Sequence, residues 1–413
     1  MDDDQSKFWL ELPLYLTKKY QKTLSFMHII TVTTEPSSRR GGIEKSTLDI
    51  CHSLANRGHQ ISLIYFKAGD LLEQYQQFCQ KLIEVDDLDI NKYRPLTSTI
   101  QFLRSISSAR KQLEISDEKN TIIYTDDYLH CLFASLLAWQ QKLPSVFHLR
   151  LPLLNKIPRK YLFSFKLIKH FIAVSNQTKL DWIEAGIKGS KISVVYNGIN
   201  PTIFQPTPNL SEVRNQFNLS PEQKVISYVG RIDRPKGIET LIKACGLLCQ
   251  KNGNSIKLLI VGLPVNHPSR EAGEQYKRSL ENLAISLGLE NRVEFLGHVA
   301  DIPSIYQASD LTVLPSLYSE PFGRTIIESM SCGVPVLGSK VGGIPEILTG
   351  EFAEGLFTAG KEEELCANLQ KMIDWREKNP LLGARCRHHI FSNFSLDTTV
   401  DGVEKVFLQV INN

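Results

Sequence analysis

The feature that most constrains this chain is a strand–helix rhythm that runs along the sequence, stops once and starts again. Short apolar runs rich in β-branched residues alternate with amphipathic stretches of helical length. This alternation predicts an α/β fold with parallel sheets and helices on both faces of each sheet. The predicted strands are residues 27–33, 60–66, 121–125, 145–149, 170–175 and 191–197, followed by 224–230, 256–262, 292–297, 310–315 and 335–339.

The interruption is the segment YNGINPTIFQPTPNL, which begins at Tyr196 and has Asn-Gly, three prolines and no periodicity. A chain of 413 residues is longer than one compact core usually holds. We expect an N-terminal Rossmann-like domain over 25–200 and a C-terminal one over 201–390, with facing strand ends that form a cleft. Residues 1–24 are an N-terminal extension without a predicted role. Residues 391–413 are a predicted helix that packs back toward the first domain.

Composition indicates a globular enzyme, with 42% hydrophobic and 22% charged residues. The net charge of +3 is too small to indicate a nucleic-acid partner. The eight cysteines are scattered without a C-x-x-C pair, which argues against disulfides and zinc and fits a reducing cytosol. The sequence has neither a signal-peptide pattern at its acidic start nor the ~18 apolar residues of a spanning helix. We therefore expect a cytoplasmic protein.

Basic residues concentrate in one stretch, 128–180, which has no acidic residue. Three interpretations stay open: a solvated surface, a face for an anionic acceptor, and peripheral contact with the inner face of a membrane. Within this stretch, 153–170 mixes aromatic and basic residues, as a membrane-surface helix does. A core-facing helix whose lysines reach solvent would look the same. The basic residues are Lys142, Arg150, Lys156, Arg159, Lys160, Lys166, Lys169 and Lys179.

The segment VGRIDRPKGIETLIKA contains a predicted anion site. A strand ends at Gly230, a loop carries Arg231 and Lys236, and a helix opens at Gly237. A helix N-terminus offers unpaired N–H groups and a positive dipole end. Two cations beside it predict a site for a phosphate or another anion.

The segment EPFGRTIIESMSCG places Glu320 in a loop and Glu328 about two turns into the following helix. The two carboxylates are therefore not neighbours on one helix face. Backbone N–H groups of Phe322 and Gly323 lie at the helix start, where they point at the cleft. We interpret the segment as a clamp for hydroxyls and phosphates, in which Glu328 accepts bonds from a vicinal diol and does not transfer a proton.

The segment SSRRGGIEKS follows the first predicted strand and precedes a helix. Gly41 and Gly42 allow the backbone to approach a ligand closely, although a Gly-Gly pair alone is a weak signal. The segment is not G-x-G-x-x-G, so a dinucleotide-binding fingerprint is absent from the place where a dehydrogenase would have it.

Three further sites have ambiguous signals. His148 stands at the end of the predicted strand 145–149, where a side chain faces the cleft more often than the core. Asp126 and Asp127 follow another strand in the same way. The Asp-x-Asp pattern at 87–89 matches a metal motif of some sugar transferases, but no predicted strand precedes it, and we interpret it as a solvated turn.

Taken together, these segments resemble glycosyltransferase family 4, the retaining nucleotide-sugar transferases with the GT-B fold, from about residue 27 to 400. The resemblance rests on GGIEKSTLDICHSLANRGHQISL, FIAVSNQTK, VVYNGIN and VGRIDRPKG, and above all on EPFGRTIIESMSCGVPVLGSKVGGIPEIL with its E-x7-E spacing. It is loose between 70 and 140, in the half expected to bind the acceptor.

The resemblance implies roles for residues at the donor nucleotide. Arg231 and Lys236 would neutralise the donor diphosphate, and Glu328 would hold the ribose hydroxyls. The backbone amides of Gly41 and Gly42 would reach the diphosphate from the other domain when the cleft closes.

The resemblance also implies contacts to the transferred sugar. Glu320 and the backbone of Phe322 and Gly323 would contact it, as would His148, which would also stabilise developing charge. His148, Arg231, Lys236 and Glu320 are the predicted catalytic residues. The mechanism that the resemblance implies is same-face attack, in which the leaving phosphate helps to deprotonate the acceptor. We expect no essential divalent metal, because the sequence has no convincing cluster of metal ligands.

The function implied is transfer of a hexose-type sugar from a nucleotide-diphosphate sugar to a carbohydrate or lipid-linked acceptor, in polysaccharide or glycolipid biosynthesis. UDP is the first expectation for the donor nucleotide and GDP the second, and no cofactor is required. Two alternatives stay open: a GT-B epimerase or phosphorylase, and a catalytically silent protein that binds sugar nucleotides.

Overall fold

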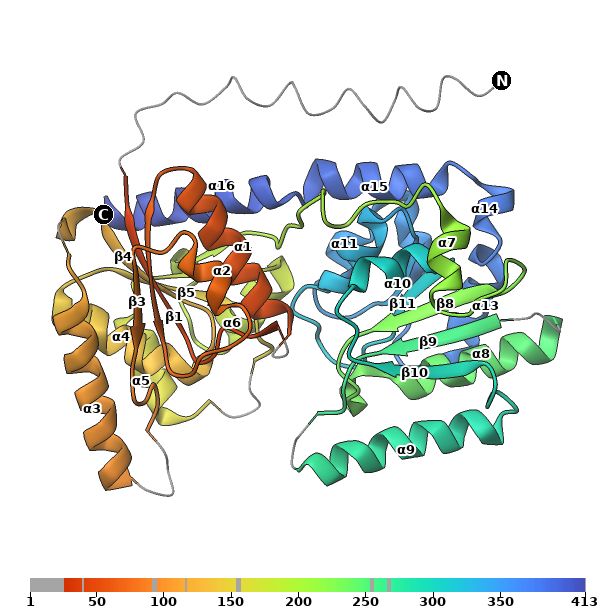
Figure 1. Ribbon diagram of the computed structural model, residues 1–413, viewed down its shortest axis with the longest axis horizontal. Helices are drawn as coiled ribbons and strands as arrows, with labels where there is room; N and C mark the ends of the chain where they lie inside the picture. The colour runs from red at the N-terminus through yellow and green to blue at the C-terminus, as the bar shows by residue number, and fades with distance from the viewer. Residues whose placement is uncertain are drawn as a thin grey trace.

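The computed structural model shows two α/β halves, each built on one parallel sheet (Figure 1). It describes residues 26–38, 41–90, 95–115, 117–153, 157–252, 256–265 and 269–412. The predicted extension over 1–24 lies outside these residues. The fold class predicted from the strand–helix rhythm is confirmed.

The first sheet has seven strands in the order β3-β2-β1-β4-β5-β6-β7. All residues of the central strand β1 are buried, because helices cover both faces of the sheet. The strands are β1 (His28–Thr33), β2 (Gln60–Tyr65), β3 (Lys81–Glu84), β4 (Thr121–Thr125), β5 (Ser145–Leu149), β6 (His170–Ala173) and β7 (Ile192–Val194).

The second sheet has six strands in the order β10-β9-β8-β11-β12-β13. All eleven predicted strands exist in the two sheets, and two short edge strands, β3 and β13, were missed. The strands are β8 (Lys224–Val229), β9 (Ile256–Val261), β10 (Val293–Gly297), β11 (Leu311–Leu314), β12 (Val336–Ser339) and β13 (Leu356–Phe357).

Two layers of helices enclose the first sheet (Figure 1). Apolar side chains of α1, α2 and α16 form one core with the sheet, and those of α3 and α4 form another. α5 and α6 pack with α4 in a cluster of aromatic side chains. The helices of this half are α1 (Gly42–Asn56), α2 (Leu72–Gln76), α3 (Pro95–Gln112), α4 (Tyr128–Gln141), α5 (Arg159–Leu167) and α6 (Asn176–Glu184).

In the second half, α8 packs against α9 and α13, while α11 packs against α10 and α15. None of the described helices is long and apolar enough to cross a bilayer. The helices after the linker are α7 (Leu210–Asn215), α8 (Ile238–Asn252), α9 (Arg270–Ser286), α10 (Ile302–Ala308), α11 (Arg324–Ser331), α12 (Ile344–Ile347), α13 (Glu362–Met372), α14 (Trp375–Lys378), α15 (Leu382–Asn393) and α16 (Leu396–Ile411).

After α15, the chain crosses back to the first half, and α16 lies along α1 (Figure 1). Val403, Phe407 and Val410 of α16 are buried in the core that α1 shares with the sheet. Glu404, which is also buried, accepts bonds from Arg57 (2.6 Å) and His59 (2.9 Å) just beyond α1. Both apolar packing and an ion pair therefore hold this helix on the first half.

Direct bonds also join the two halves. The carboxylate of Glu346 on α12 accepts the backbone N–H groups of Asn176 and Gln177, each at 2.8 Å, at the start of α6. It accepts the Tyr196 hydroxyl as well, at 2.9 Å. The Ser175 hydroxyl donates to the carbonyl of Pro321 at 2.6 Å. A carboxylate at a helix N-terminus is favourable because it meets unpaired N–H groups and the positive end of the helix dipole.

Candidate active site

A cleft of about 270 Å³ lies between the two halves, at the carboxyl ends of their strands. The loop before α1 and the segment after β5 line it from one side, and the ends of β8 and β11 and the start of α11 line it from the other. Seven of the nine residues predicted for the site line this cleft, and His148 and Glu328 do not. The seven are Gly41, Gly42, Arg231, Lys236, Glu320, Phe322 and Gly323.

Lys236 and Glu320 form a nearly buried ion pair in this cleft. Lys236 ends the 3-10 helix Arg234–Lys236 after β8, and its Nζ lies 2.6 Å from Glu320 Oε2. Burial alone would lower the pKa of Lys236, but the Glu320 charge raises it above its ordinary value. Burial alone would raise the pKa of Glu320, but Lys236 and the Ser316 hydroxyl lower it. Both groups are therefore charged at neutral pH.

A glycine lets the Lys236 loop approach the Glu320 loop. Gly237 has φ 70°, a left-handed conformation that favours glycine, and a Cβ built on it would lie 2.0 Å from the carbonyl oxygen of Pro315. The backbone N–H of Leu317 donates to the carbonyl of Pro235 at 2.7 Å. The two loops thus touch through their backbones, which brings the ammonium group to the carboxylate.

Arg231 is the second cation of this wall. It follows β8, and the Tyr228 hydroxyl donates to its carbonyl at 2.7 Å. Its residue is exposed, and no described carboxylate forms an ion pair with its guanidinium. Because Lys236 is already paired, Arg231 is the charge on this wall that is available to an anion.

Glu328 lies at the fifth residue of α11, so the prediction of two turns into the helix was wrong by almost one turn. Arg324 Nε donates to its Oε1, and the Tyr306 hydroxyl donates to its Oε2, both at 2.9 Å. Sequence reasoning missed both partners, although the i, i+4 spacing of Arg324 and Glu328 was a readable signal. Glu328 thus stands directly behind the cleft wall, held by two donors.

Arg324 connects this wall to the other half. Its Nη1 donates to the Ser46 hydroxyl of α1, and Gly42 faces its side chain so closely that a Cβ there would lie 3.0 Å from Cδ. Burial alone would lower the pKa of Arg324, but Glu328 and Asp49 raise it above its ordinary value. The guanidinium therefore bridges Ser46 of the first half and Glu328 of the second.

His148 is fully buried at the end of β5, so the prediction that it faces the cleft was wrong. Its Nδ1 lies 2.7 Å from the Tyr124 hydroxyl. Burial, and after it the neighbouring Arg150 charge, hold its pKa well below the ordinary value, so the ring is neutral. The alternation of side chains along β5 points His148 toward the α16 side of the sheet, among packed residues such as Tyr124 and Phe407.

The other ambiguous acidic residues have structural partners. Asp126 accepts from the Thr47 hydroxyl, and Asp127 caps α4 by accepting the Leu129 N–H at 3.0 Å. The strand β3 precedes the Asp-x-Asp pattern at 87–89, so the expectation of no strand there was wrong.

In that pattern, Lys160 Nζ lies 2.7 Å from Asp89 Oδ1. Among the described residues, no group of three or more His, Cys, Asp and Glu side chains has a metal-binding arrangement.

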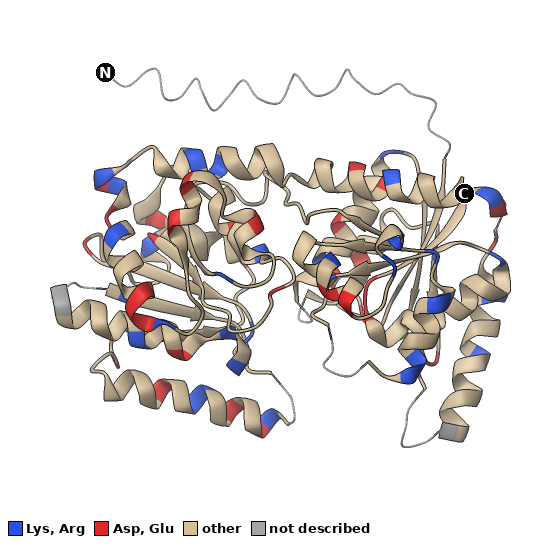
Figure 2. Cartoon of the chain, turned by 180° about the vertical axis from the view of Figure 1, so that it is seen from behind, with Lys and Arg blue, Asp and Glu red and all other residues tan. Residues whose placement is uncertain are grey.

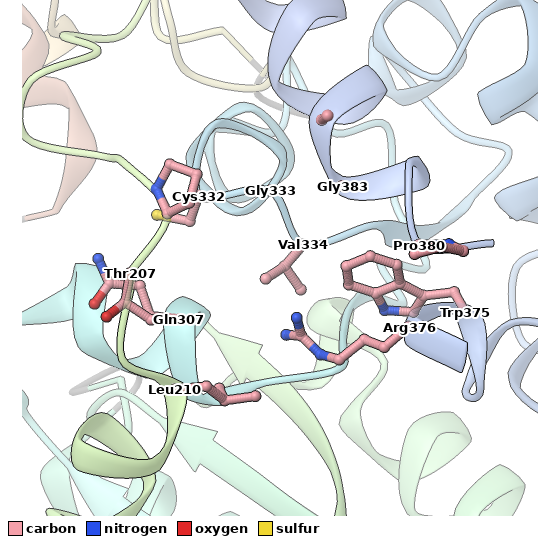
Figure 3. A pocket seen from close by; sticks show the side chains of 12 residues that line it. Thr207, Leu210, Gln307, Cys332, Gly333, Val334, Trp375, Arg376, Pro380 and Gly383 are labelled. Carbon is pink, nitrogen blue, oxygen red and sulfur yellow. The ribbon is translucent and has the colours of Figure 1, made fainter. Parts of the chain in front are cut away.

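A second cavity, of about 170 Å³, lies in the second half beside the linker (Figure 3). Trp375, Arg376 and Val334 line it, and none of the predicted site residues does. Arg376 Nε already donates to Asp310 at 2.9 Å, and Trp375 Nε1 to the carbonyl of the same residue at 2.7 Å. Its polar groups are thus engaged within the protein, unlike Arg231 in the cleft.

Two protein-family models match the chain, one in each half. The model described as Glycosyltransferase Family 4 matches residues 40–203, and the model described as Glycosyl transferases group 1 matches residues 211–387.

Individual proteins are similar over different shares of their length. A D-inositol 3-phosphate glycosyltransferase of Rhodococcus opacus is 33% identical over 223 residues, which are 53% of this chain and 48% of that protein, about half its length. The N-acetyl-alpha-D-glucosaminyl L-malate synthase of Bacillus anthracis is 24% identical over 402 residues, which are 93% of this chain and 97% of that protein.

Solved structures share the fold. HepE of Anabaena, solved with UDP-glucose, has a TM-score of 0.77 at 24% identity and covers 93% of this chain and 100% of its own. WaaG, a glycosyltransferase involved in lipopolysaccharide biosynthesis, has a TM-score of 0.67 at 16% identity and covers 92% of this chain and 99% of its own.

Proposed function

The chain belongs to glycosyltransferase family 4, among the group 1 glycosyl transferases with the GT-B fold, and on this premise we propose that it is a retaining, nucleotide-sugar-dependent hexosyltransferase. Residues 25–200 would bind the acceptor and residues 201–390 the donor. The observation that carries the proposal is the cleft wall on which Arg231 is exposed next to the Lys236–Glu320 pair. A wall of this kind suits a leaving group that departs as a diphosphate anion.

UDP is the nucleotide that we propose first and GDP the second. HepE of Anabaena was solved with UDP and with UDP-glucose, which supports a UDP-sugar for a chain of the same fold. In our proposal, Arg231 and Lys236 neutralise the diphosphate, and the N–H groups of Gly41 and Gly42 approach it from the opposite wall. Glu328 accepts the ribose hydroxyls, with Arg324 and Tyr306 fixing its orientation.

The chemical step needs charge stabilisation more than proton transfer by a side chain. As the bond to the anomeric carbon breaks, negative charge grows on the diphosphate, where preorganised cations and N–H groups stabilise it. Glu320 is charged and paired with Lys236, so its role is to position Lys236 and the sugar rather than to donate a proton. The leaving phosphate takes the acceptor proton on the same face, which retains the anomeric configuration. No metal or other cofactor enters this scheme.

The alternative functions of this site can be distinguished by their substrates and products. An epimerase would interconvert the free nucleotide sugar, and a phosphorylase would consume inorganic phosphate. A silent binding protein would bind the donor without releasing the nucleotide.

The first experiment is thermal unfolding with UDP, GDP and ADP in turn, with EDTA present, for the wild type and Glu328→Ala. A ligand at ~100 times its dissociation constant stabilises by ~2.7 kcal/mol, a clear melting shift. We expect UDP to shift the wild type and not the variant. If no nucleotide shifts the wild type, the proposed donor site is wrong. Nucleotide release from UDP-glucose, with water or sugars as acceptor, then separates a transferase from a silent binder.

We also propose that α5 contacts an anionic membrane surface. Tyr161 and Phe165 face the core, whereas Leu162 is 42% and Phe163 51% exposed. The buried face of α5 therefore agrees with the core-facing interpretation, and the exposed face agrees with the membrane interpretation. In Figure 2, basic and acidic residues both occur on each half, so the proposal rests on the basic residues of α5 itself, Arg159, Lys160 and Lys166.

Flotation with vesicles of phosphatidylcholine and phosphatidylglycerol tests the contact. We expect the double variant Leu162→Ser, Phe163→Ser to bind the anionic vesicles more weakly than the wild type at low salt. Leu180→Ser, at a 53% exposed leucine on α6, is the matched control and should bind like the wild type. Failure of the wild type to float with these vesicles at low salt would overturn the proposal.

A further inference from the structure

Arg150 is a buried cation in the cleft whose role the predicted donor site does not account for. It follows β5 directly, lines the cleft from the first half, and is 7% exposed. It belongs to the basic stretch 128–180, but it is buried, whereas Lys142, Lys166 and Lys169 of that stretch are exposed. The donor cations Arg231 and Lys236 line the opposite wall.

The guanidinium has two partners within the protein, the Tyr124 hydroxyl and the side chain of Asn197. Its Nη1 donates to Oδ1 of Asn197, at the start of the linker. Its Nε and Nη2 are buried and have no acceptor among the described residues. No carboxylate of those residues forms an ion pair with it. A buried charge without a counter-ion is costly, and the cost falls when an anion occupies the free donors.

His148 is a neighbour of this guanidinium inside the core and does not line the cleft. Its ring is neutral, and Nδ1 lies 2.7 Å from the Tyr124 hydroxyl. Burial raises the pKa of Tyr124, so that hydroxyl keeps its proton and donates to Nδ1. The single ring proton is then on Nε2, and this nitrogen is also buried without a partner in the described chain.

We propose that Arg150 binds an anionic group of the acceptor, a carboxylate or a phosphate, on the first-half wall of the cleft. The fork of a guanidinium matches either group, because it presents parallel N–H donors to two oxygens. Asn197 is the positioning residue that holds the fork. The inference rests on the proposed transferase function, because it assumes that the donor diphosphate occupies the opposite wall.

The competing source of an anion is the donor diphosphate itself, and saturation with UDP separates the two. Unfolding of the wild type is measured with EDTA and saturating UDP, while inorganic phosphate is titrated as the probe at constant ionic strength. We expect phosphate to raise the melting temperature beyond the UDP effect. In Arg150→Met, UDP should still stabilise, and phosphate should bind at least tenfold more weakly.

Arg150→Met replaces the guanidinium by an apolar side chain of similar length, so the variant should fold at least as stably as the wild type without ligands. Arg150→Lys is the second variant; it keeps the charge but not the fork, and it too should bind phosphate more weakly. Arg278→Gln, which removes an exposed arginine on α9, is the charge control and should behave as the wild type.

Each outcome decides a different question. A missing UDP effect in the wild type contradicts the proposed function, whatever phosphate does. Two outcomes overturn the inference about Arg150 but leave the proposed function intact. In the first, UDP raises the melting temperature of the wild type and phosphate raises it no further. In the second, phosphate stabilises Arg150→Met as much as the wild type. Tenfold weaker UDP binding in Arg150→Met with unchanged phosphate binding would assign Arg150 to the donor instead.

Discussion

At the scale of single residues, two of the cations that line the cleft are in opposite situations. Lys236 is nearly buried and paired with Glu320, whereas Arg231 is exposed and has no ion-pair partner among the described residues. A paired lysine provides a fixed charge whose position does not depend on ligand. An unpaired arginine gains its partner when an anion arrives.

Replacement of Arg231 by alanine should therefore impair catalysis without impairing folding. We expect kcat to fall by ~10²–10³, the typical effect of removing one preorganised charge-stabilising group. The melting temperature without ligand should stay near that of the wild type, because the side chain is exposed. Nucleotide release from the donor measures the first quantity and thermal unfolding the second.

Arg234→Ala is the matched control, since Arg234 lies three residues away on the same turn and is 73% exposed, with Glu239 rather than the cleft as its partner. Equal losses of kcat in the two variants would show that general charge, and not the position of Arg231, is what matters.

At the scale of secondary-structure elements, the docking of α16 depends on one buried carboxylate. The side chain of Glu404 is 8% exposed, and its carboxylate accepts hydrogen bonds from both Arg57 and His59. Glu404→Ala would leave His59 without its acceptor and Arg57 with Asp401 as its remaining partner. Removing one partner of a buried pair typically costs about 3–5 kcal/mol. We expect a lower melting temperature for Glu404→Ala, and no comparable change for Lys405→Ala at the exposed neighbouring position.

The same carboxylate predicts how stability changes with pH. The His59 hydrogen bond outweighs burial and, with Arg57, lowers the pKa of Glu404 below its ordinary 4.5. A lowered folded-state pKa contributes stability above pH 4.5 that is lost as the pH falls through the folded-state value. Denaturant unfolding at stepped pH should show a steeper loss below 4.5 in the wild type than in Glu404→Ala. Parallel curves would contradict this assignment.

The elements that sequence reasoning found and missed differ in burial. The strand β5 has the sequence SVFHL, and all of its residues are buried. A fully buried strand has a mainly apolar sequence, which is easy to recognise. KLIE, the strand β3, is an edge strand with only one fully buried residue, so its pattern is weak. Arg150 could not be placed from sequence, since its burial depends on Asn197, 47 residues away, and on the closed cleft. His148 was misplaced for a similar reason, because its position depends on how α16 covers the sheet.

At the scale of the whole molecule, Glu346 holds the two halves together through the N-terminus of α6. Glu346→Ala removes these bonds, so the halves should separate more often and the cleft should be assembled for less of the time. We expect a larger radius of gyration by X-ray scattering and a roughly tenfold lower kcat/KM, equivalent to about 1.4 kcal/mol.

Glu354→Ala serves as the control for Glu346→Ala, because Glu354 pairs with Lys371 within the second half. Wild-type scattering and wild-type turnover in Glu346→Ala would show that other contacts, such as Ser175 to Pro321, suffice to keep the cleft closed.

The return of α16 to the first half also bears on how the protein is made. Val400, Val403, Val406, Phe407 and Val410 of α16 complete a core whose other buried members precede the linker. The ribosome must therefore synthesise the whole second half before that core is complete. During this interval, the apolar face of β4 that later receives Phe407 lacks its cover. Independent folding of the first half during translation, the usual order for domains in series, is thus incomplete here. The first half is therefore completed only after the second half has been synthesised, and a ribosome that stalls in the second half leaves the first unfinished.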